Sequence, residues 1–207
     1  MVFADTAKGC KFIYRDVPGV LISDLTKRRV HRIVVANGVF LRNGDSVCLD
    51  AVPEEQGKKL RSLMEAVPKQ NTLMHGDYHT NNIMVQNGEP LLIDMDTLCM
   101  GHPIFELGSM FNAFIGYSEL DHQVNMNFFG YSHETAERFW DLTLKMYLGT
   151  EDAEVCRGVA EKAMIVGYTR MLRRAIRRPN DADSPAKIAR CKEMLAVLLD
   201  KIDTLEF

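Results

Sequence analysis

The sequence predicts an α+β fold that is mainly helical and contains one short β-hairpin. Three observations predict it: residues 1–52 hold short apolar runs separated by Gly-containing turns, residues 53–207 show mostly helical periodicity, and a hairpin pattern at residues 83–93 interrupts the helices. We therefore expect a short β-rich segment at residues 1–52 and a helical unit at residues 53–207. The boundary lies where turn-rich strand composition gives way to helices.

The first segment contains five apolar runs of strand length, punctuated by Pro18-Gly19, Asn37-Gly38 and Asn43-Gly44. Short strands joined by tight turns predict a small sheet. The expected strands cover residues 11–14, 20–23, 31–36, 39–42 and 46–49.

Five helices are expected in the second segment. Their apolar positions recur at helical spacing, and their ends carry residues that favour helix ends, with Ser132 and Thr150 as start signals, Gly149 as a stop signal, and Ser184-Pro185 opening the last helix. The expected ranges are 53–67, 103–116, 132–148, 150–178 and 184–202.

The hairpin carries the first functional signal. Two apolar runs, residues 83–86 and 90–93, flank Asn87-Gly88-Glu89, and Asn-Gly between such runs strongly favours a hairpin. A turn centred near Gly88 predicts that Asn82 and Asp94 face each other. An amide oxygen and a carboxylate at one end of a hairpin suit Mg²⁺, which prefers oxygen ligands and takes few protein carboxylates besides substrate phosphates.

A second signal precedes the hairpin. His75, Asp77 and Asn82 have the spacing H-x-D-x-x-x-x-N of a phosphate-transferring catalytic loop, in which the Asp addresses the acceptor hydroxyl and the Asn holds a magnesium ion. The metal-binding carboxylate that such a site needs on a nearby strand is Asp94. Together these residues indicate phosphoryl transfer.

With Gly101-His102-Pro103 and Glu106-Leu107, these motifs resemble the aminoglycoside phosphotransferase and choline kinase superfamily, a branch of the protein-kinase-like fold. The resemblance is close over residues 70–116 and loose over the helical remainder. It implies a kinase-like helical C-terminal lobe that carries the catalytic hairpin. Only 74 residues precede His75, and no G-x-G-x-x-G occurs, so we expect a reduced or partial N-terminal lobe and a kinase that is weak or inactive as this chain alone.

The resemblance also implies the site residues. Asp77 matches the catalytic aspartate, Asn82 and Asp94 match the metal and nucleotide ligands, and His75 matches the histidine that braces the loop. Glu106 matches an acidic residue that ties down the catalytic segment and opens a helix. His79 and Asp96 are expected to support the site.

The implied reaction transfers the γ-phosphoryl group of ATP to a hydroxyl of a small molecule, with Mg²⁺ as cofactor. Two positions depart from the family pattern: Met95 stands where the family often has Trp, and His102 stands where it often has Asp. Both changes are expected to alter packing or substrate preference before metal binding.

Two other functions compete with this one. His75, Asp77 and His79 alternate, so on a strand they would place three metal ligands on one face, as in a hydrolase that uses zinc or manganese to activate water. Alternatively, the chain is a non-catalytic kinase-like binding module that keeps the metal corner but lacks the lobe that grips nucleotide.

Composition restricts the partners and the cellular location that we expect for this protein. The net charge of −3 indicates no nucleic-acid partner, five dispersed cysteines indicate reduced thiols, and no apolar run approaches a membrane span, so we expect a cytoplasmic protein. Charged residues give opposite indications about the acceptor. Arginines between residues 170 and 178 form a basic stripe, whereas Glu119, Asp121 and Glu134 suit a cationic acceptor.

Overall fold

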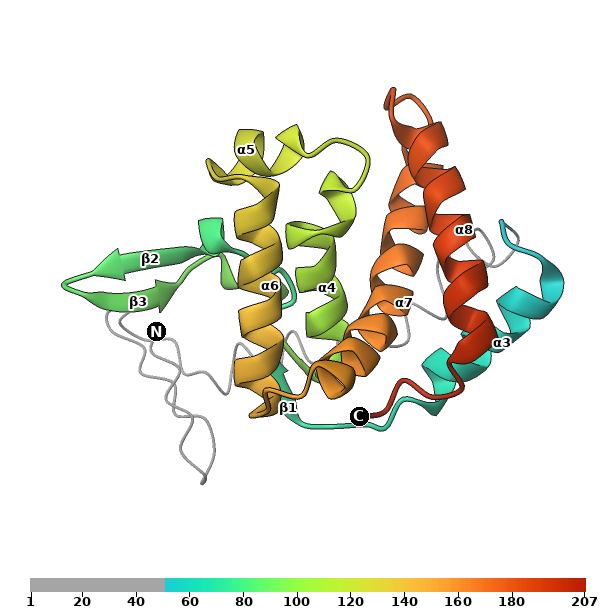
Figure 1. The fold of residues 1–207 in the computed structure, drawn as a ribbon, viewed down its shortest axis with the longest axis horizontal. Helices are drawn as coiled ribbons and strands as arrows, with labels where there is room; N and C mark the ends of the chain where they lie inside the picture. Colours follow the sequence, from blue (N-terminus) through green and yellow to red (C-terminus); the bar gives the residue numbers. More distant parts are fainter. Residues whose placement is uncertain (1–50) are drawn as a thin grey trace.

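The computed structural model describes residues 51–207, which fold into helices with two small antiparallel sheets (Figure 1). This confirms the α+β, mainly helical prediction for that part of the chain. The five predicted strands before residue 50, Cys10 and Cys48 lie outside the described residues, and the boundary near residue 52 stays a prediction.

Six helices and four strands make up the described part. The helices are α3 (Glu54–Ala66), α4 (Ile104–Phe114), α5 (Gln123–Phe129), α6 (His133–Leu148), α7 (Ala153–Arg177) and α8 (Ser184–Lys201). The strands are β1 (Thr72–Met74), β2 (Ile83–Gln86), β3 (Glu89–Leu92) and β4 (Cys99–Gly101), and short 3₁₀ turns lie at Thr80–Asn82, Met95–Thr97 and Gly116–Ser118.

The ends of α6 follow the predicted signals. The Ser132 hydroxyl accepts a hydrogen bond from the backbone N–H of Thr135, and Gly149 closes the helix in a left-handed conformation with φ of 64°. The predicted start of α7 at Thr150 is wrong. Asp152 is the N-cap, because its Oδ1 accepts from the N–H groups of Glu154 and Val155.

The core forms where α4 and α7 run side by side in the same direction, with α6 and α8 running the opposite way on either side (Figure 1). Phe111 and Phe114 of α4 and Tyr168 of α7 are fully buried. Two glycines allow the close approach: a Cβ on Gly108 would lie 2.6 Å from a Val166 methyl, and one on Gly167 would lie 2.5 Å from the Phe111 ring.

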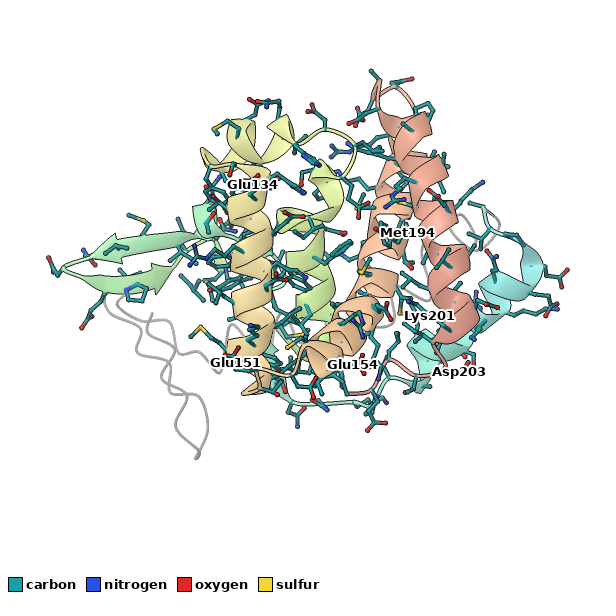
Figure 2. The ribbon with its side chains drawn as sticks, viewed as in Figure 1. Glu134, Glu151, Glu154, Met194, Lys201 and Asp203 are labelled. Carbon is teal, nitrogen blue, oxygen red and sulfur yellow. The ribbon has the colours of Figure 1, made fainter. Side chains whose placement is uncertain are left out.

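Polar contacts fasten the lower end of this bundle. Lys59 of α3 pairs with Asp203 at 2.7 Å, and Lys201 at the end of α8 pairs with Glu161 of α7; Figure 2 shows Lys201 and Asp203 together at this end. Among residues 51–207, Cys99, Cys156 and Cys191 are buried and form no disulfide bond. Within residues 51–207, no helix has both the length and the apolar character needed to span a membrane.

The two sheets are separate ribbons. Strand β1 pairs with β4 close to the helices, whereas the β2–β3 hairpin projects away from them (Figure 1). The hairpin pairs Ile83 with Leu92 and Gln86 with Glu89, so its loop is the two residues Asn87 and Gly88, both with positive φ.

The predicted register is therefore wrong by one residue. A two-residue loop places the turn centre between Asn87 and Gly88, and the N–H of Ile93 donates to the carbonyl of Asn82 at 2.9 Å. Asn82 faces Ile93, and Asp94 comes one residue later. The two predicted metal ligands still lie at the same end of the hairpin, but they do not form a cross-strand pair.

The glycine contacts give a stability prediction. Replacing Gly167 by Ala should lower the free energy of unfolding by about 1–3 kcal/mol, since the added methyl overlaps the Phe111 ring and the Asn112 amide. Chemical denaturation measures the change. Gly158 lies in the same helix with nothing within 4 Å of its would-be Cβ, so Gly158→Ala should stabilise by about 0.5–1 kcal/mol. Equal effects of the two substitutions would contradict this packing.

Candidate active site

The candidate catalytic loop runs from His75 to Asn82 and joins β1 to β2. Helix α4 bonds both backbone polar groups of Gly76: its N–H donates to Glu106 Oε2 at 2.8 Å, and its carbonyl accepts from the Ser109 hydroxyl at 3.2 Å. Gly76 has φ of 81°, and a Cβ there would lie 2.7 Å from the carbonyl oxygen of Thr97. This position therefore requires glycine.

His75 connects the loop to the hairpin. Its ring is buried, Nδ1 accepts from the N–H of Asp77 at 3.3 Å, and Nε2 lies 2.9 Å from the carbonyl oxygen of Ile93. Because Nδ1 accepts, Nε2 carries the hydrogen and donates it to Ile93. The Thr97 hydroxyl donates to the carbonyl of His75 at 2.7 Å. His75 thus braces the loop from both sides.

Asp77 presents its carboxylate to solvent, with 56% of its side chain exposed. The His79 ring beside it, with Nε2 3.7 Å from Asp77 Oδ2, holds the pKa of this carboxyl below its ordinary value; partial burial opposes the effect, and the charges of Arg170 and His75 add to it. The carboxylate is therefore charged at neutral pH and available to a hydroxyl group.

Asn82 is buried at the end of the loop. Its backbone N–H donates to the carbonyl of His79, and its side-chain Nδ2 donates to the carbonyl of Asp77 at 2.9 Å. Asp94 is exposed and adopts a left-handed conformation with φ of 55° directly after Ile93. This conformation is uncommon for a residue other than glycine, although Asp tolerates it better than most, and it favours a functional role.

Glu106 lies in the first turn of α4 and is largely buried. Burial raises the pKa of its carboxyl, against the opposing effects of the Gly76 N–H bond and of the charges of His75 and Arg170. Its second oxygen, Oε1, is buried and has no hydrogen-bond partner among residues 51–207.

Comparison with known sequences shows the family. The model of the phosphotransferase enzyme family matches residues 24–142, which is more than half of the chain. The chain belongs to this family. The match confirms the resemblance predicted from the loop and hairpin motifs.

Two solved structures are also similar, both of a thermostable mutant of the aminoglycoside phosphotransferase APH(4)-Ia. The complex with ADP and hygromycin B is 18% identical with a TM-score of 0.42, covering 69% of this chain and 42% of that one. The apo form is 17% identical with a TM-score of 0.45, covering 83% of this chain and 53% of that one. The chain thus spans about half the length of these structures, and no curated protein matches it.

The described residues fit the magnesium ion that the phosphotransferase family implies. Both hydrogens of the Asn82 amide point into the loop, toward the Asp77 carbonyl and His79 Nε2, so Oδ1 is the atom left for a cation. Asp94 adds an exposed carboxylate at the same end of the hairpin. One amide and one carboxylate, completed by phosphate oxygens and water, make a usual magnesium environment.

The hydrolase alternative fails on geometry. Strand β1 ends at Met74, so His75, Asp77 and His79 do not share a strand face, and the His75 ring is occupied by backbone groups. Among residues 51–207, no group of three or more His, Cys, Asp or Glu side chains is placed to hold a metal ion.

The segment around α5, which covers one side of the loop, was not predicted from the sequence. The Asn81 amide donates to the carbonyl of Phe128 at 2.8 Å, and the Thr80 and Tyr131 hydroxyls lie 3.0 Å apart. Helix α5 is only seven residues long, and apolar periodicity gives little signal over so few residues. Gly130, which ends α5 with φ of 80°, was the available signal.

Two of the three residues predicted to contact a cationic acceptor, Glu119 and Asp121, have other partners. Glu119 accepts from the Tyr168 hydroxyl at 2.5 Å and from Arg190 at 3.2 Å, which ties the 3₁₀ turn after α4 to α7 and α8. Asp121 accepts from the N–H of Gln123 just before α5, and Glu134 is exposed at the start of α6 (Figure 2). Glu119 is therefore a structural residue.

The structure also places the arginine stripe, His102 and Asp96. In the arginine stripe, Arg174 lies over the Tyr117 ring. The positive charge of Arg170 lowers the pKa of both the Asp77 and the Glu106 carboxyl groups. His102 is buried and accepts from the N–H of Ile104 through Nδ1, so it helps to begin α4. Asp96 lies in the 3₁₀ turn Met95–Thr97, and its supporting role stays a prediction.

The buried Glu106 carboxyl gives a pH prediction. Because the pKa of Glu106 is higher in the folded protein than its unfolded-state value of 4.5, the contribution of this carboxyl to stability is complete below pH 4.5. That contribution is lost as the pH rises through the pKa of the folded protein. Glu106→Gln keeps an oxygen for the Gly76 N–H and removes this titration. The melting temperature of the native protein should therefore fall relative to that of Glu106→Gln as the pH rises above 4.5.

Thermal unfolding of both proteins across this pH range measures the difference. Glu134→Gln removes one carboxylate from an exposed position and corrects for the change in net charge. Parallel curves of melting temperature against pH for the native protein and Glu106→Gln would contradict a raised pKa of Glu106.

Proposed function

We propose that this protein transfers the γ-phosphoryl group of ATP to a hydroxyl group of a small molecule in a magnesium-dependent reaction. The observation that carries the proposal is the link between the two loop residues: the Asn82 amide donates to the carbonyl of Asp77 at 2.9 Å, while Asp94 follows the hairpin partner of Asn82. Membership of the phosphotransferase family supports it independently.

Each residue has one role in this proposal. Asn82 Oδ1 and the Asp94 carboxylate would hold the magnesium ion, which supplies positive charge to the phosphates when it is bound. The exposed Asp77 carboxylate accepts a hydrogen bond from the acceptor hydroxyl and aims it at the phosphorus atom. Its low pKa indicates that orientation matters more here than strong basicity.

His75 and Glu106 do not act on the substrate in this scheme. They hold the backbone on each side of Asp77 through the bonds to Ile93 and Gly76. Catalysis of this kind depends on fixed positions of charge and dipoles, so a rigid loop is part of the proposed function. The cytoplasmic location expected from the sequence stays a prediction.

Nucleotide binding tests the proposal first. ATP with Mg²⁺ should raise the melting temperature of the full chain. At a ligand concentration 100 times the Kd, the free energy of unfolding should increase by about 2.7 kcal/mol. The shift should need the metal and should disappear in Asp94→Ala, which removes the proposed carboxylate ligand. A native chain that responds neither to ATP nor to Mg²⁺ with ATP would contradict the proposal and favour the non-catalytic binding module.

Asp77 can be tested separately from nucleotide binding. Asp77→Asn should lower kcat by about 100-fold or more, because an amide presents a donor to the acceptor hydroxyl and cannot take its proton. Transfer of labelled phosphate from ATP to a panel of small alcohols measures kcat. The shift in melting temperature with Mg²⁺ and ATP should persist in this variant, and its loss together with turnover would contradict the assigned role.

A further inference from the structure

His79 lies between the two residues on which the proposed function depends. Its Nε2 is 3.4 Å from Asn82 Nδ2 and 3.7 Å from Asp77 Oδ2. Among residues 51–207, His79 is the one group within ion-pair distance of the Asp77 carboxylate. One ring nitrogen therefore faces both the proposed metal ligand and the proposed acceptor-binding carboxylate.

The ring is held there by aromatic side chains from the α5 segment. His79 is buried, its ring centroid is 5.4 Å from that of Phe128 and 5.8 Å from that of Phe129, and both rings meet it at steep angles. The Asn81 amide fixes Phe128 by bonding its carbonyl. The direction of Nε2 is therefore set by packing and not by the substrate.

Two acceptors, the Asp77 carbonyl and His79 Nε2, decide which way the Asn82 amide points. Nδ2 has two hydrogens, and the carbonyl of Asp77 accepts one while Nε2 of His79 faces the other. A flipped amide would set Oδ1 against the Asp77 carbonyl, so two acceptors would meet. Only the observed orientation leaves Oδ1 free for an outside cation.

We infer that His79 is a positioning residue: its Nε2 accepts the second hydrogen of the Asn82 amide, so that Oδ1 of Asn82 turns toward the magnesium ion. The inference rests on the proposed function and names a residue that positions one of its metal ligands. The Nδ1 atom of His79 is buried and has no partner among residues 51–207, so the ring retains an unpaired polar atom in an aromatic environment. An apolar ring would fit this environment better, which indicates that Nε2 is the reason for a histidine.

A pair of substitutions separates this role from packing. His79→Phe keeps a ring between Phe128 and Phe129 but removes Nε2, whereas His79→Gln offers an amide oxygen that can accept from Asn82. His122→Phe is the matched control, since His122 is an exposed histidine before the first residue of α5, whereas the loop contacts lie at Phe128 near the end of that helix. Phenylalanine also keeps a ring to stack on His133. A purely structural role predicts that His79→Phe behaves like the native protein.

The measurement is a Mg²⁺ titration of the ATP-induced rise in melting temperature, performed on the full chain. His79→Phe should raise the Mg²⁺ concentration at half-maximal effect by about tenfold, the usual consequence of removing a residue that orients a metal ligand. His79→Gln should recover part of this loss, and His122→Phe should match the native protein. An unchanged midpoint in His79→Phe, with the native protein still responding to Mg²⁺, overturns the inference and leaves the proposed function standing.

A second comparison tests the inference even if His79→Phe does not fold. His79→Gln in the native background should shift the midpoint, but in an Asn82→Ala background it should have no further effect, because the amide through which it acts is gone. Additive shifts overturn the inference. A native chain without any Mg²⁺-dependent nucleotide binding overturns the proposed function, and the inference fails with it.

Discussion

The candidate site depends on how Gly76 is held. Helix α4 bonds its N–H through Glu106 and its carbonyl through Ser109, while the Thr97 carbonyl occupies the space that a side chain would need. The loop conformation at this point is thus fixed by the first turns of a helix. Because α4 in turn packs against α7 where Gly108 and Gly167 admit no further atom, the candidate catalytic loop takes its position from a tightly packed part of the core.

The hairpin reaches the same loop from the other side. Ile93 is bonded to both ends of the loop, since its carbonyl accepts from His75 and its N–H donates to Asn82. Asp94 therefore begins from a fixed backbone position, and its left-handed conformation sets the direction in which the chain leaves the strand. A short side chain on a fixed backbone loses little conformational freedom when it binds a cation. Fixing the loop has a cost, because one buried oxygen of Glu106 has no hydrogen-bond partner among residues 51–207.

Local signals in the sequence were sufficient for features that depend on near neighbours. The cap at Ser132, the stop at Gly149 and the spacing of Asp77 and Asn82 all depend on residues within one or two turns. The hairpin was predictable but its register was not, because Asn-Gly fits loops of two or three residues and the choice depends on the φ angles adopted. The pairing of Glu119 with Arg190 joins positions 71 residues apart, and no local pattern contains it.

The loop is held at both ends and least in the middle. Its first residues are bonded to α4 and to Ile93, the residue after β3. Its last residues, Thr80 to Asn82, are bonded to the α5 segment, to Ile93 and to the loop itself. Asp77 stands between these two fixed parts with half of its side chain exposed and a single ring beside it. Such a distribution suits the proposed function, in which Asn82 and Asp94 would hold a metal ion in a fixed place while the Asp77 carboxylate would adjust to the acceptor. His79 belongs to the fixed part as well, because the rings of Phe128 and Phe129 pack against its ring.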